Sequence, residues 1–418
     1  MFSILYSVAI RLYYLAIRVY SLFNTKAARW VRGRNQIEKD IAHLRAKNNP
    51  RIWFHCASVG EFEQALPLLE LLKNEYQGCE YFISFFSPSG YEYAQRKHPE
   101  LSISYLPYDT SSGIDYFLRV VKPDLVFIVK YELWYRLLQR LRAHQIPTFL
   151  ISGIFHPSHF MFSTWGKWYR STLRCFTHLF LQDRQSAELL QGIGIDELSV
   201  VGDTRFDRVL EIRSSIFKDD IIEQFADRAP IFVAGSVWNT DDEVVKALIE
   251  GLPLDWKIIL VPHEIAHYTC DFIGERVMRY SEFNADNNTR ILLLDVMGLL
   301  SGLYRYASFA YVGGGFGRGL HNTAEAAIYQ IPVLIGPTFD KFREARELND
   351  LGLLFPIRSA IEAKSWCKRL NNNEINFQEI SKGLEQYFAV NTNVSEKIIV
   401  FLKRKGYLIN KHPKKSYF

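Results

Sequence analysis

The chain of 418 residues is too long for one ordinary hydrophobic core, which favours two domains of roughly 150 to 200 residues each. Hydrophobic residues make up 48% of it, and no long segment has a disordered composition, so we expect a globular protein. The five cysteines are scattered without a C-x-x-C pair, which argues against a disulfide framework and a cysteine zinc site and favours a reducing compartment.

The net charge of +5 is unevenly distributed. Residues 1–37 and 398–418 contain no acidic residue and 12 of the 50 lysines and arginines, which leaves 38 basic against 45 acidic residues in 38–397. A nucleic-acid-binding protein would instead spread positive charge along a groove. Two basic ends, one joined to an apolar segment, favour an anionic membrane surface, with a solvated tail as the alternative for 403–418.

Residues 1–23 are rich in Leu, Ile, Val, Tyr and Phe but lack the basic start and the small-residue cleavage site of a secretory signal. Arg11 and Arg18 would make a membrane-spanning helix costly. They are seven residues apart, so they share one helical face and can reach lipid headgroups together. We expect a membrane-associated helix with a basic flank over 1–35 that lies in the membrane surface. A single span and an ordinary packed helix are the alternatives.

From residue 51 onward, short β-rich runs alternate with helical stretches, which predicts βαβ units and parallel sheets. The candidate strands of the first half are 52–56, 81–86, 102–106, 125–130, 148–152, 178–182 and 198–202, and those of the second half are 231–235, 257–261, 291–294, 309–312 and 333–335. The pattern predicts two doubly wound Rossmann-like domains facing across a cleft, at 36–212 and 229–400, with a linker at 213–228 and a basic tail at 401–418. Ligands of such sheets bind at the carboxyl ends of strands.

The first candidate strand runs into the sequence A-S-V-G-E, which places Glu61 near a helix N-terminus at the carboxyl end of a strand. A carboxylate there can accept a proton from a hydroxyl nucleophile, and general-base help of this kind is worth about 10² to 10⁴ in rate. The alternative is that Glu61 only complements the helix dipole.

Two further strand ends carry charged residues. Lys130 and Glu132 follow the strand at 125–130, beside Trp134, and Arg205 follows the last strand of the first half. A guanidinium at that place can contact a phosphate. A helix-capping glutamate, a packed tryptophan and an ion pair of Arg205 with Asp203 or Asp207 are the alternatives.

The strand at 309–312 is followed by a glycine-rich turn that contains Gly313, Gly314, Gly315 and Gly317, and then by a helical pattern. A turn that opens onto a helix N-terminus presents unpaired N–H groups to an anion, which predicts a phosphate or nucleotide site. Neither G-x-G-x-x-G nor G-x-x-x-x-G-K-[ST] occurs, so dinucleotide and P-loop chemistry are disfavoured. Glu325 could accept hydrogen bonds from a ribose. A tight structural turn is the alternative.

The sequence V-P-H-E-I-A-H contains a literal H-E-x-x-H, formed by His263, Glu264 and His267. This zinc-protease motif functions only inside a helix, where both histidines share a face. Here it follows a candidate strand and Pro262 directly. We therefore expect a strand-to-helix turn rather than a zinc site.

Together these segments resemble the Kdo (3-deoxy-D-manno-octulosonic acid) transferases of Gram-negative bacteria, which have the two-domain GT-B glycosyltransferase fold. The resemblance covers nearly the whole chain. It is carried by ASVGE (57–61), YLPYD (105–109), ELW (132–134), PHE (262–264), DVMG (295–298), GLHNTAEAA (319–327), IPVLIGP (331–337) and FREA (342–345).

The resemblance implies an inverting transferase of the cytoplasmic face of the cell inner membrane, which moves Kdo from CMP-Kdo to a lipid A precursor of the lipid IVA type in lipopolysaccharide core biosynthesis. It implies that Glu61 is the general base and that no metal or other cofactor is required. The residues that it assigns to the CMP site are Pro262, His263, Met297, Gly298, Leu299, Asn322, Thr323, Ala324 and Glu325.

Three positions depart from the family pattern. Lys130 stands where many relatives have a glutamate, Arg205 where a lysine is usual, and Leu299 where a glutamate follows Met-Gly.

The alternative functions are another GT-B nucleotide-sugar transferase or an epimerase, a non-catalytic nucleotide-binding module and a zinc hydrolase.

Overall fold

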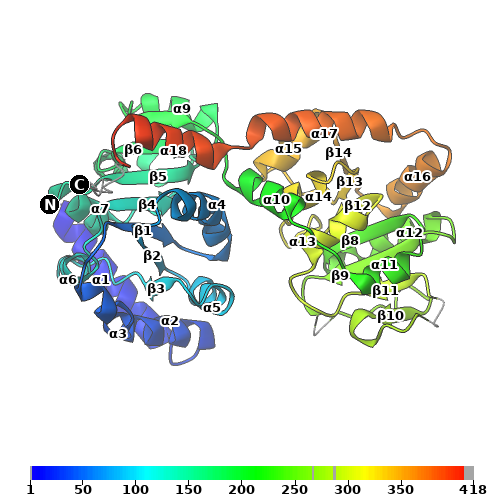
Figure 1. The fold of residues 1–418 in the computed structure, drawn as a ribbon, viewed down its shortest axis with the longest axis horizontal. Coiled ribbons are helices and arrows are strands. Elements are labelled where there is room, and N and C mark those ends of the chain that lie inside the picture. The colour runs from blue at the N-terminus through cyan, green and yellow to red at the C-terminus, as the bar shows by residue number, and fades with distance from the viewer. Residues whose placement is uncertain (1, 266–267, 286–288, 409–418) are drawn as a thin grey trace, which may run out of the picture. The chain divides into compact units, whose positions relative to one another are not determined.

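The computed structural model describes residues 2–265, 268–285 and 289–408. The chain forms two compact units (Figure 1). The first unit contains the residues up to Arg208 and those from Thr392 onward, and the second contains Val209–Asn391.

The first unit is built on a seven-stranded, all-parallel sheet of order β3-β2-β1-β4-β5-β6-β7. Its strands are β1 (Arg51–Cys56), β2 (Glu80–Phe85), β3 (Ser102–Tyr105), β4 (Leu125–Val129), β5 (Thr148–Gly153), β6 (His178–Leu181) and β7 (Leu198–Val200). Its helices are α1 (Phe2–Tyr20), α2 (Thr25–Asn35), α3 (Ile37–Ile41), α4 (Val59–Glu75), α5 (Pro88–Lys97), α6 (Ser111–Val121), α7 (Tyr135–Ala143), α8 (Arg170–Leu173), α9 (Arg184–Gln191) and α18 (Val394–Arg404). Helix α10 (Arg205–Ser214) contains the boundary to the second unit.

The second unit repeats this architecture, with a parallel sheet of order β10-β11-β9-β8-β12-β13-β14. Its strands are β8 (Ile231–Val237), β9 (Lys257–Pro262), β10 (Val277–Arg279), β11 (Ile291–Leu293), β12 (Phe309–Val312), β13 (Val333–Ile335) and β14 (Leu354–Pro356). Its helices are α11 (Asp220–Ala226), α12 (Asp242–Gly251), α13 (Leu300–Leu303), α14 (Ala324–Ala327), α15 (Arg343–Asp350), α16 (Ala360–Asn371) and α17 (Phe377–Asn391).

The central strands are nearly continuous apolar runs because helices cover both faces of each sheet. Every residue of β1, β4 and β12 is buried. All twelve sequence-predicted strands are present, with ends that differ by at most two residues, and the fold class is confirmed. The strands missed are β10 and β14, each of three residues and each at an edge of the second sheet, where the apolar run is short.

The order of strands reverses once in each sheet, and ligand sites of doubly wound folds lie at this switch point. In the first sheet it falls between β1 and β4, and in the second between β8 and β12. Ligands are therefore expected at the segments that follow these four strands.

The domain boundaries differ from those predicted at the C-terminal end. The sequence places 229–400 in one domain, but α18 belongs to the first unit. The reason is its apolar face, since Ile398, Ile399 and Leu402 are buried in the core of the first unit. The predicted linker at 213–228 contains the end of α10 and the whole of α11.

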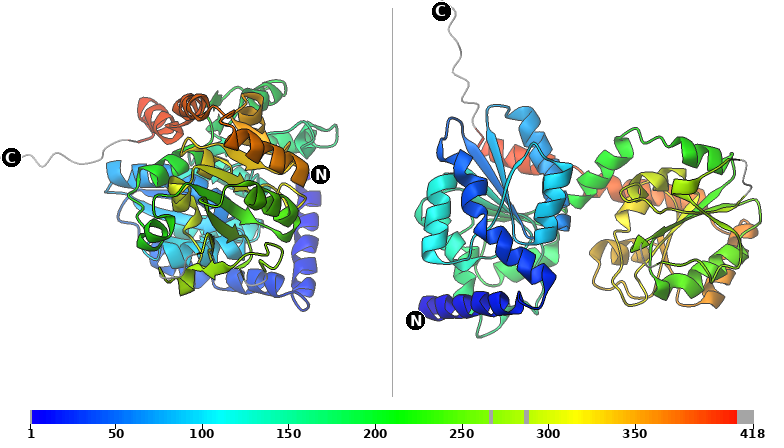
Figure 2. Two further views of the ribbon diagram at one scale, coloured as in Figure 1. Left: turned by 90° about the vertical axis from the view of Figure 1, so that its right-hand side faces the viewer. Right: turned by 90° about the horizontal axis from the view of Figure 1, so that it is seen from below.

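Helix α1 packs beside α2, and Figure 2 shows the two as dark blue helices that meet at a corner. Tyr6 and Tyr14 attach α1 to the rest of the unit, since both hydroxyls bond to Asp109. None of the helices in the described part of the chain combines the length and hydropathy that a membrane span requires.

Candidate active site

Glu61 lies in the first turn of α4, directly after β1, as predicted. It is buried, with 6% of its surface exposed, and its Oε2 accepts the N–H of Ala57. Burial raises the pKa of Glu61, and the nearby charge of Glu132 raises it further, against the opposing effects of the Ala57 N–H, Lys130 and His55. A carboxyl group with a raised pKa binds a proton more readily, which suits a general base.

Lys130 and Glu132 follow β4 at the switch point, and the pKa of Glu61 responds to both charges. Lys130 has a left-handed backbone (φ 60°), which is uncommon for a residue with a side chain and concentrates at functional sites. Glu132 accepts a hydrogen bond from Trp134 Nε1 at 2.8 Å. The structure thus brings together three residues that the sequence placed on two separate strand ends.

Arg205 forms an ion pair with Asp203, with 2.8 Å between Nε and Oδ2. Burial alone would raise the pKa of Asp203, but the Arg205 charge, its backbone N–H and the Gln64 amide bring that pKa below its usual value. Asp207 accepts the N–H groups of Val394 and Ser395, at the start of α18. Asp203 therefore holds Arg205 in a fixed orientation.

The glycine-rich turn follows β12 at the switch point of the second sheet. The N–H of Gly313 donates to the Gly235 carbonyl and that of Gly314 to the carboxylate of Asp241. A Cβ on Gly315 would lie 2.6 Å from Gly336 Cα, so this glycine permits two backbones to pack closely. Part of the motif is thus structural. The predicted phosphate role of Gly313 and Gly314 would require their N–H groups to exchange partners.

The helix after this turn consists of the single turn Ala324–Ala327, so its dipole is small. Thr323 is its N-cap residue and is buried, and Ala324 donates its N–H to Asn322. Asn322 in turn donates to Glu325 at 3.0 Å. These four predicted CMP-binding residues form one local cluster.

Three aromatic rings stack beside the turn. Trp238 follows β8, His263 follows β9, and His321 follows the glycines, with 4.4 Å between the ring centroids of Trp238 and His263 and 4.4 Å between those of the two histidines. Trp238 Nε1 donates to Nε2 of His321 at 3.0 Å. Burial and the neighbouring His263 lower the pKa of His321 to about 4, so this ring is neutral at physiological pH.

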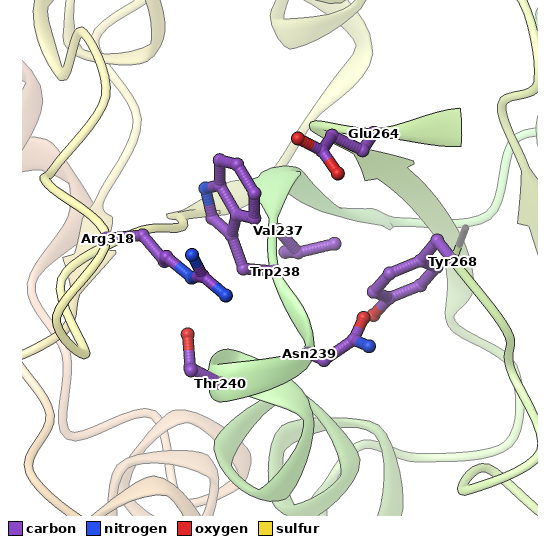
Figure 3. Close-up of a pocket in the computed structure, with 7 residues that line it drawn as sticks. All are labelled: Val237, Trp238, Asn239, Thr240, Glu264, Tyr268 and Arg318. Carbon is purple, nitrogen blue, oxygen red and sulfur yellow. The ribbon is translucent and has the colours of Figure 1, made fainter. Parts of the chain in front are cut away.

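A pocket of about 110 Å³ lies beside this stack (Figure 3). The Arg318 guanidinium reaches toward it from the glycine-rich turn, 5.4 Å from the centre of the Trp238 ring. Asn239, Thr240, Tyr268 and the carboxylate of Glu264 complete the polar lining. The Arg318 cation can pair with an anionic group, and the Trp238 ring can pack against a planar one.

Met297 is 86% exposed and Gly298 has a positive φ of 90°, so Leu299 lies beyond an exposed turn after β11. Pro262 ends β9 and is buried, while His263 lies at the bend that follows. The H-E-x-x-H motif therefore does not begin within a helix, and His267 lies outside the described residues. Among the residues that the structure describes, no group of three His, Cys, Asp or Glu side chains could hold a metal ion.

Sequence reasoning missed His55, Trp238 and Asp241, and it did not assign a role to Arg318 or His321. The first three had a signal, because His55 interrupts the apolar run I-W-F-H-C and the other two follow the predicted strand at 231–235. Asp241 is fully buried and accepts from the N–H of Trp238 and the hydroxyl of Tyr311.

Comparison with known proteins identifies the relatives of this chain. Residues 31–208 match the family model described as 3-deoxy-D-manno-octulosonic-acid transferase (kdotransferase). The chain is 26% identical over 382 residues to a bifunctional glycosyltransferase/methyltransferase of Fusobacterium nucleatum, and this match covers 87% of the chain and 59% of that protein. It is 26% identical over 338 residues to the 3-deoxy-D-manno-octulosonic acid transferase of Haemophilus influenzae, covering 76% and 77% of the two chains.

Among solved structures, a UDP-GlcNAc 2-epimerase from Neisseria meningitidis, bound to UDP-GlcNAc, superposes with a TM-score of 0.62 at 14% identity. The match covers 85% of this chain and all of the epimerase, and at this identity it shows the fold alone. Two doubly wound units of this kind define the GT-B class. Within that class, the chain is similar in sequence to Kdo transferases, through the family model over residues 31–208 and through relatives that are 23% to 27% identical to it.

Proposed function

We propose that this protein transfers Kdo from CMP-Kdo onto a lipid A precursor, with inversion at the anomeric carbon, in lipopolysaccharide biosynthesis. The observation that carries the proposal is the position of Glu61, a buried carboxyl group at the switch point of the first sheet whose pKa is raised by burial and by Glu132. The names of the relatives support Kdo as the transferred sugar, and the matched family model supports transfer as the reaction.

In this proposal, Glu61 accepts the proton of the acceptor hydroxyl as that oxygen attacks the anomeric carbon. The raised pKa of Glu61 brings its proton affinity closer to neutral pH, where proton transfer by a general base is most effective. Lys130 offers a cation at the same strand end and could contact the carboxylate of the sugar donor. Arg205, fixed by Asp203, supplies a second cation.

The donor nucleotide is assigned to the second unit. His263 and the cluster of Asn322, Thr323 and Glu325 would hold CMP, with Arg318 near its phosphate. Since His321 is a neutral ring whose Nε2 already accepts a hydrogen bond from Trp238, it can offer only an Nδ1–H donor to the ligand. Fixed donors of this kind stabilise a departing phosphate without reorganisation.

A lipid acceptor requires access to a membrane, and α1 offers the means. Its exposed apolar residues recur every three or four positions and so follow one face of the helix. They are Ile4, Val8, Leu12, Leu15 and Val19, with Leu5 beside Ile4. Tyr6 and Tyr14 lie on the opposite side, against the protein. We propose that α1 lies in the cytoplasmic surface of the inner membrane by this face, with Arg11 and Arg18 at the headgroups.

The direct test is incubation of the full-length protein with CMP-Kdo and a tetraacylated lipid A precursor, followed by mass spectrometry of the lipid. We expect a product heavier by one or more Kdo units, and the spectrum also gives their number. Parallel incubations with UDP-GlcNAc test whether the protein is instead an epimerase that acts on a UDP-sugar. Turnover of the UDP-sugar, without any Kdo added to the lipid, would contradict the proposal.

A further inference from the structure

The segment between β5 and α8, residues 154–169, displays two large aromatic side chains to solvent. Trp165 is 85% exposed and Phe160 is 54% exposed, whereas the other tryptophans of the chain are buried or half-buried. A single exposed apolar side chain needs no explanation, but two aromatic ones on one short segment favour a surface that a partner covers.

Hydrogen bonds at the base of the segment hold these side chains in place. The Ser163 hydroxyl donates to the Phe160 carbonyl at 2.7 Å, and the N–H of Gly166 donates to the Ser163 hydroxyl at 3.1 Å. The Arg170 guanidinium donates to the Met161 carbonyl at 2.8 Å. A Cβ on Gly166 would collide with the backbone of Phe160, so the segment closes tightly on itself. Because the backbone is already ordered, a partner that binds the aromatic side chains needs to order little else.

The segment packs against α1. The ring of Trp168 lies 6.3 Å from that of Tyr6 and 5.6 Å from that of Tyr135, measured between centroids. Next to them, the Arg136 guanidinium donates to the Ser7 hydroxyl at 2.6 Å. The exposed aromatic side chains and the exposed apolar face of α1 therefore belong to neighbouring elements of the first unit.

The charge of these elements is positive. Residues 133–182 contain six lysines and arginines and no acidic residue, and the contacts with α1 join them to residues 1–37, which also lack acidic residues. Arg140 is neutralised by an ion pair with Asp115. Lys167 is exposed beside Trp165 and forms no ion pair with any residue that the structure describes. Basic residues next to exposed apolar ones attract the anionic headgroups of a membrane.

We infer that residues 154–169 are a second membrane-binding element, which inserts Trp165 and Phe160 into the headgroup region of an anionic bilayer beside α1. Tryptophan favours this region because its ring is apolar while its N–H can still bond to headgroups. The lack of acidic residues in both adjoining stretches favours lipid headgroups over a protein partner, whose surface would carry charges of both signs.

The element also reaches the candidate active site. The ring of His159 lies 5.8 Å from that of Tyr131, which stands between Lys130 and Glu132 in the sequence. Insertion of Trp165 would thus bring the bilayer toward the strand end that carries these two charges. The inference deepens the proposed function and rests on it for the lipid acceptor, which would be delivered from the bilayer, but membrane binding itself is independent of the reaction.

Fluorescence quenching tests whether Trp165 enters the bilayer. Full-length protein is mixed with vesicles of phosphatidylglycerol and phosphatidylcholine whose acyl chains are brominated, since bromine quenches tryptophans inside the bilayer. We expect strong quenching in the wild type. Trp165→Phe should bind the vesicles within about three-fold of the wild type, because phenylalanine also inserts, but most of the quenching should be lost. Equal quenching in both proteins would overturn the inference.

Co-sedimentation measures how much the element contributes to binding. The double variant with Phe160→Ser and Trp165→Ser should bind the vesicles about 10-fold more weakly or worse, because two aromatic side chains no longer leave water. The matched control carries Leu254→Ser and Ile361→Ser, which remove two exposed apolar side chains from the second unit, and should bind as the wild type does. All four positions are exposed, and circular dichroism verifies that both variants fold.

The results that would refute the inference are distinct from those that would refute the proposed function. Wild-type affinity of the Phe160 and Trp165 variant, an equal loss in the control, or equal binding to vesicles of phosphatidylcholine alone would each overturn the inference. Kdo transfer by a protein whose Trp165 is not quenched would refute this element alone. Quenching of Trp165 in a protein that transfers no Kdo would support the element and refute the proposed function.

Discussion

The carboxylate of Asp241 holds the glycine-rich turn through Gly314, whose N–H donates to Oδ2 at 3.0 Å. The same oxygen accepts the N–H of Trp238 at 2.8 Å, so one buried side chain joins the segments that follow β8 and β12. Asp241→Asn places an amide where two N–H donors converge. Since a buried donor without an acceptor costs about 1 to 3 kcal/mol, we expect a loss of about 2 kcal/mol in the free energy of unfolding, with weaker CMP binding.

Chemical denaturation and calorimetric titration with CMP measure the two effects. Asp255→Asn makes the same chemical change at an exposed position of the same unit and controls for the loss of one charge. If Asp241→Asn were as stable as Asp255→Asn and bound CMP as the wild type does, Asp241 would not organise the turn.

The strands could be predicted because each is a short buried run, and the two switch points then place Glu61 and Gly313 at ligand-binding edges. What could not be predicted is how polar side chains pair across the fold. Asp241 lies 73 positions from Gly314 in sequence, and His55 lies 77 from Glu132. Pairings over such distances depend on which strands become neighbours in the sheet, and a local sequence pattern does not specify that order. The glycines show the same limit, since the sequence did not reveal that Gly315 packs against Gly336.

Glu61→Gln tests the assignment of the base. The amide keeps the shape of the side chain but cannot accept the acceptor's proton, so the rate of Kdo transfer should fall by about 10² to 10⁴. CMP binding should be unchanged, because Glu61 belongs to the first unit and the proposed CMP residues to the second.

Glu63→Gln is the matched control for this substitution. Glu63 lies two residues further along α4 and pairs with Arg208 at 2.8 Å. Loss of this ion pair should reduce the rate of Kdo transfer by less than about 10-fold, because partly exposed ion pairs contribute little to stability. Equal losses in Glu61→Gln and Glu63→Gln would point to damage of α4 rather than to a missing base.

Lys130→Glu gives a pH-dependent prediction. The charge of Lys130 lowers the pKa of Glu61, so a carboxylate at this position should raise that pKa. The base is active only without its proton, so the acid limb of kcat/KM should move to higher pH, while the rate at high pH is less affected. If Lys130 also contacts the donor carboxylate, the KM for CMP-Kdo should rise. Unchanged activity and donor KM would exclude both roles, and Lys97→Glu, on the exposed end of α5, is the charge control.

The lowered pKa of His321 predicts that the folded protein loses stability in acid. Its pKa in the folded protein is lowered to about 4, against about 6.5 in an unfolded chain, so between these values the unfolded state binds more protons. The folded state should therefore lose stability as the pH falls from 6.5 toward 4. His321→Asn can still accept the Trp238 N–H but does not titrate. Across this interval, thermal unfolding monitored by circular dichroism should show roughly 5 °C less loss of Tm in the variant than in the wild type. Parallel curves for the two proteins would contradict the assignment.

The exposed apolar face of α1 predicts binding to anionic membranes. Replacing Ile4, Val8, Leu12 and Leu15 with serine removes much of the apolar area that would enter the bilayer, while the attachment of Tyr6 and Tyr14 to Asp109 is preserved. Since burying one such side chain is worth about 1.5 to 3 kcal/mol, co-sedimentation with phosphatidylglycerol-containing vesicles should weaken by 100-fold or more. The control variant carries serine at four exposed apolar residues elsewhere, namely Ile216, Leu254, Ile361 and Val390. If both variants bound vesicles as the wild type does, α1 would not be the membrane-binding element, and access to a lipid acceptor would need another explanation.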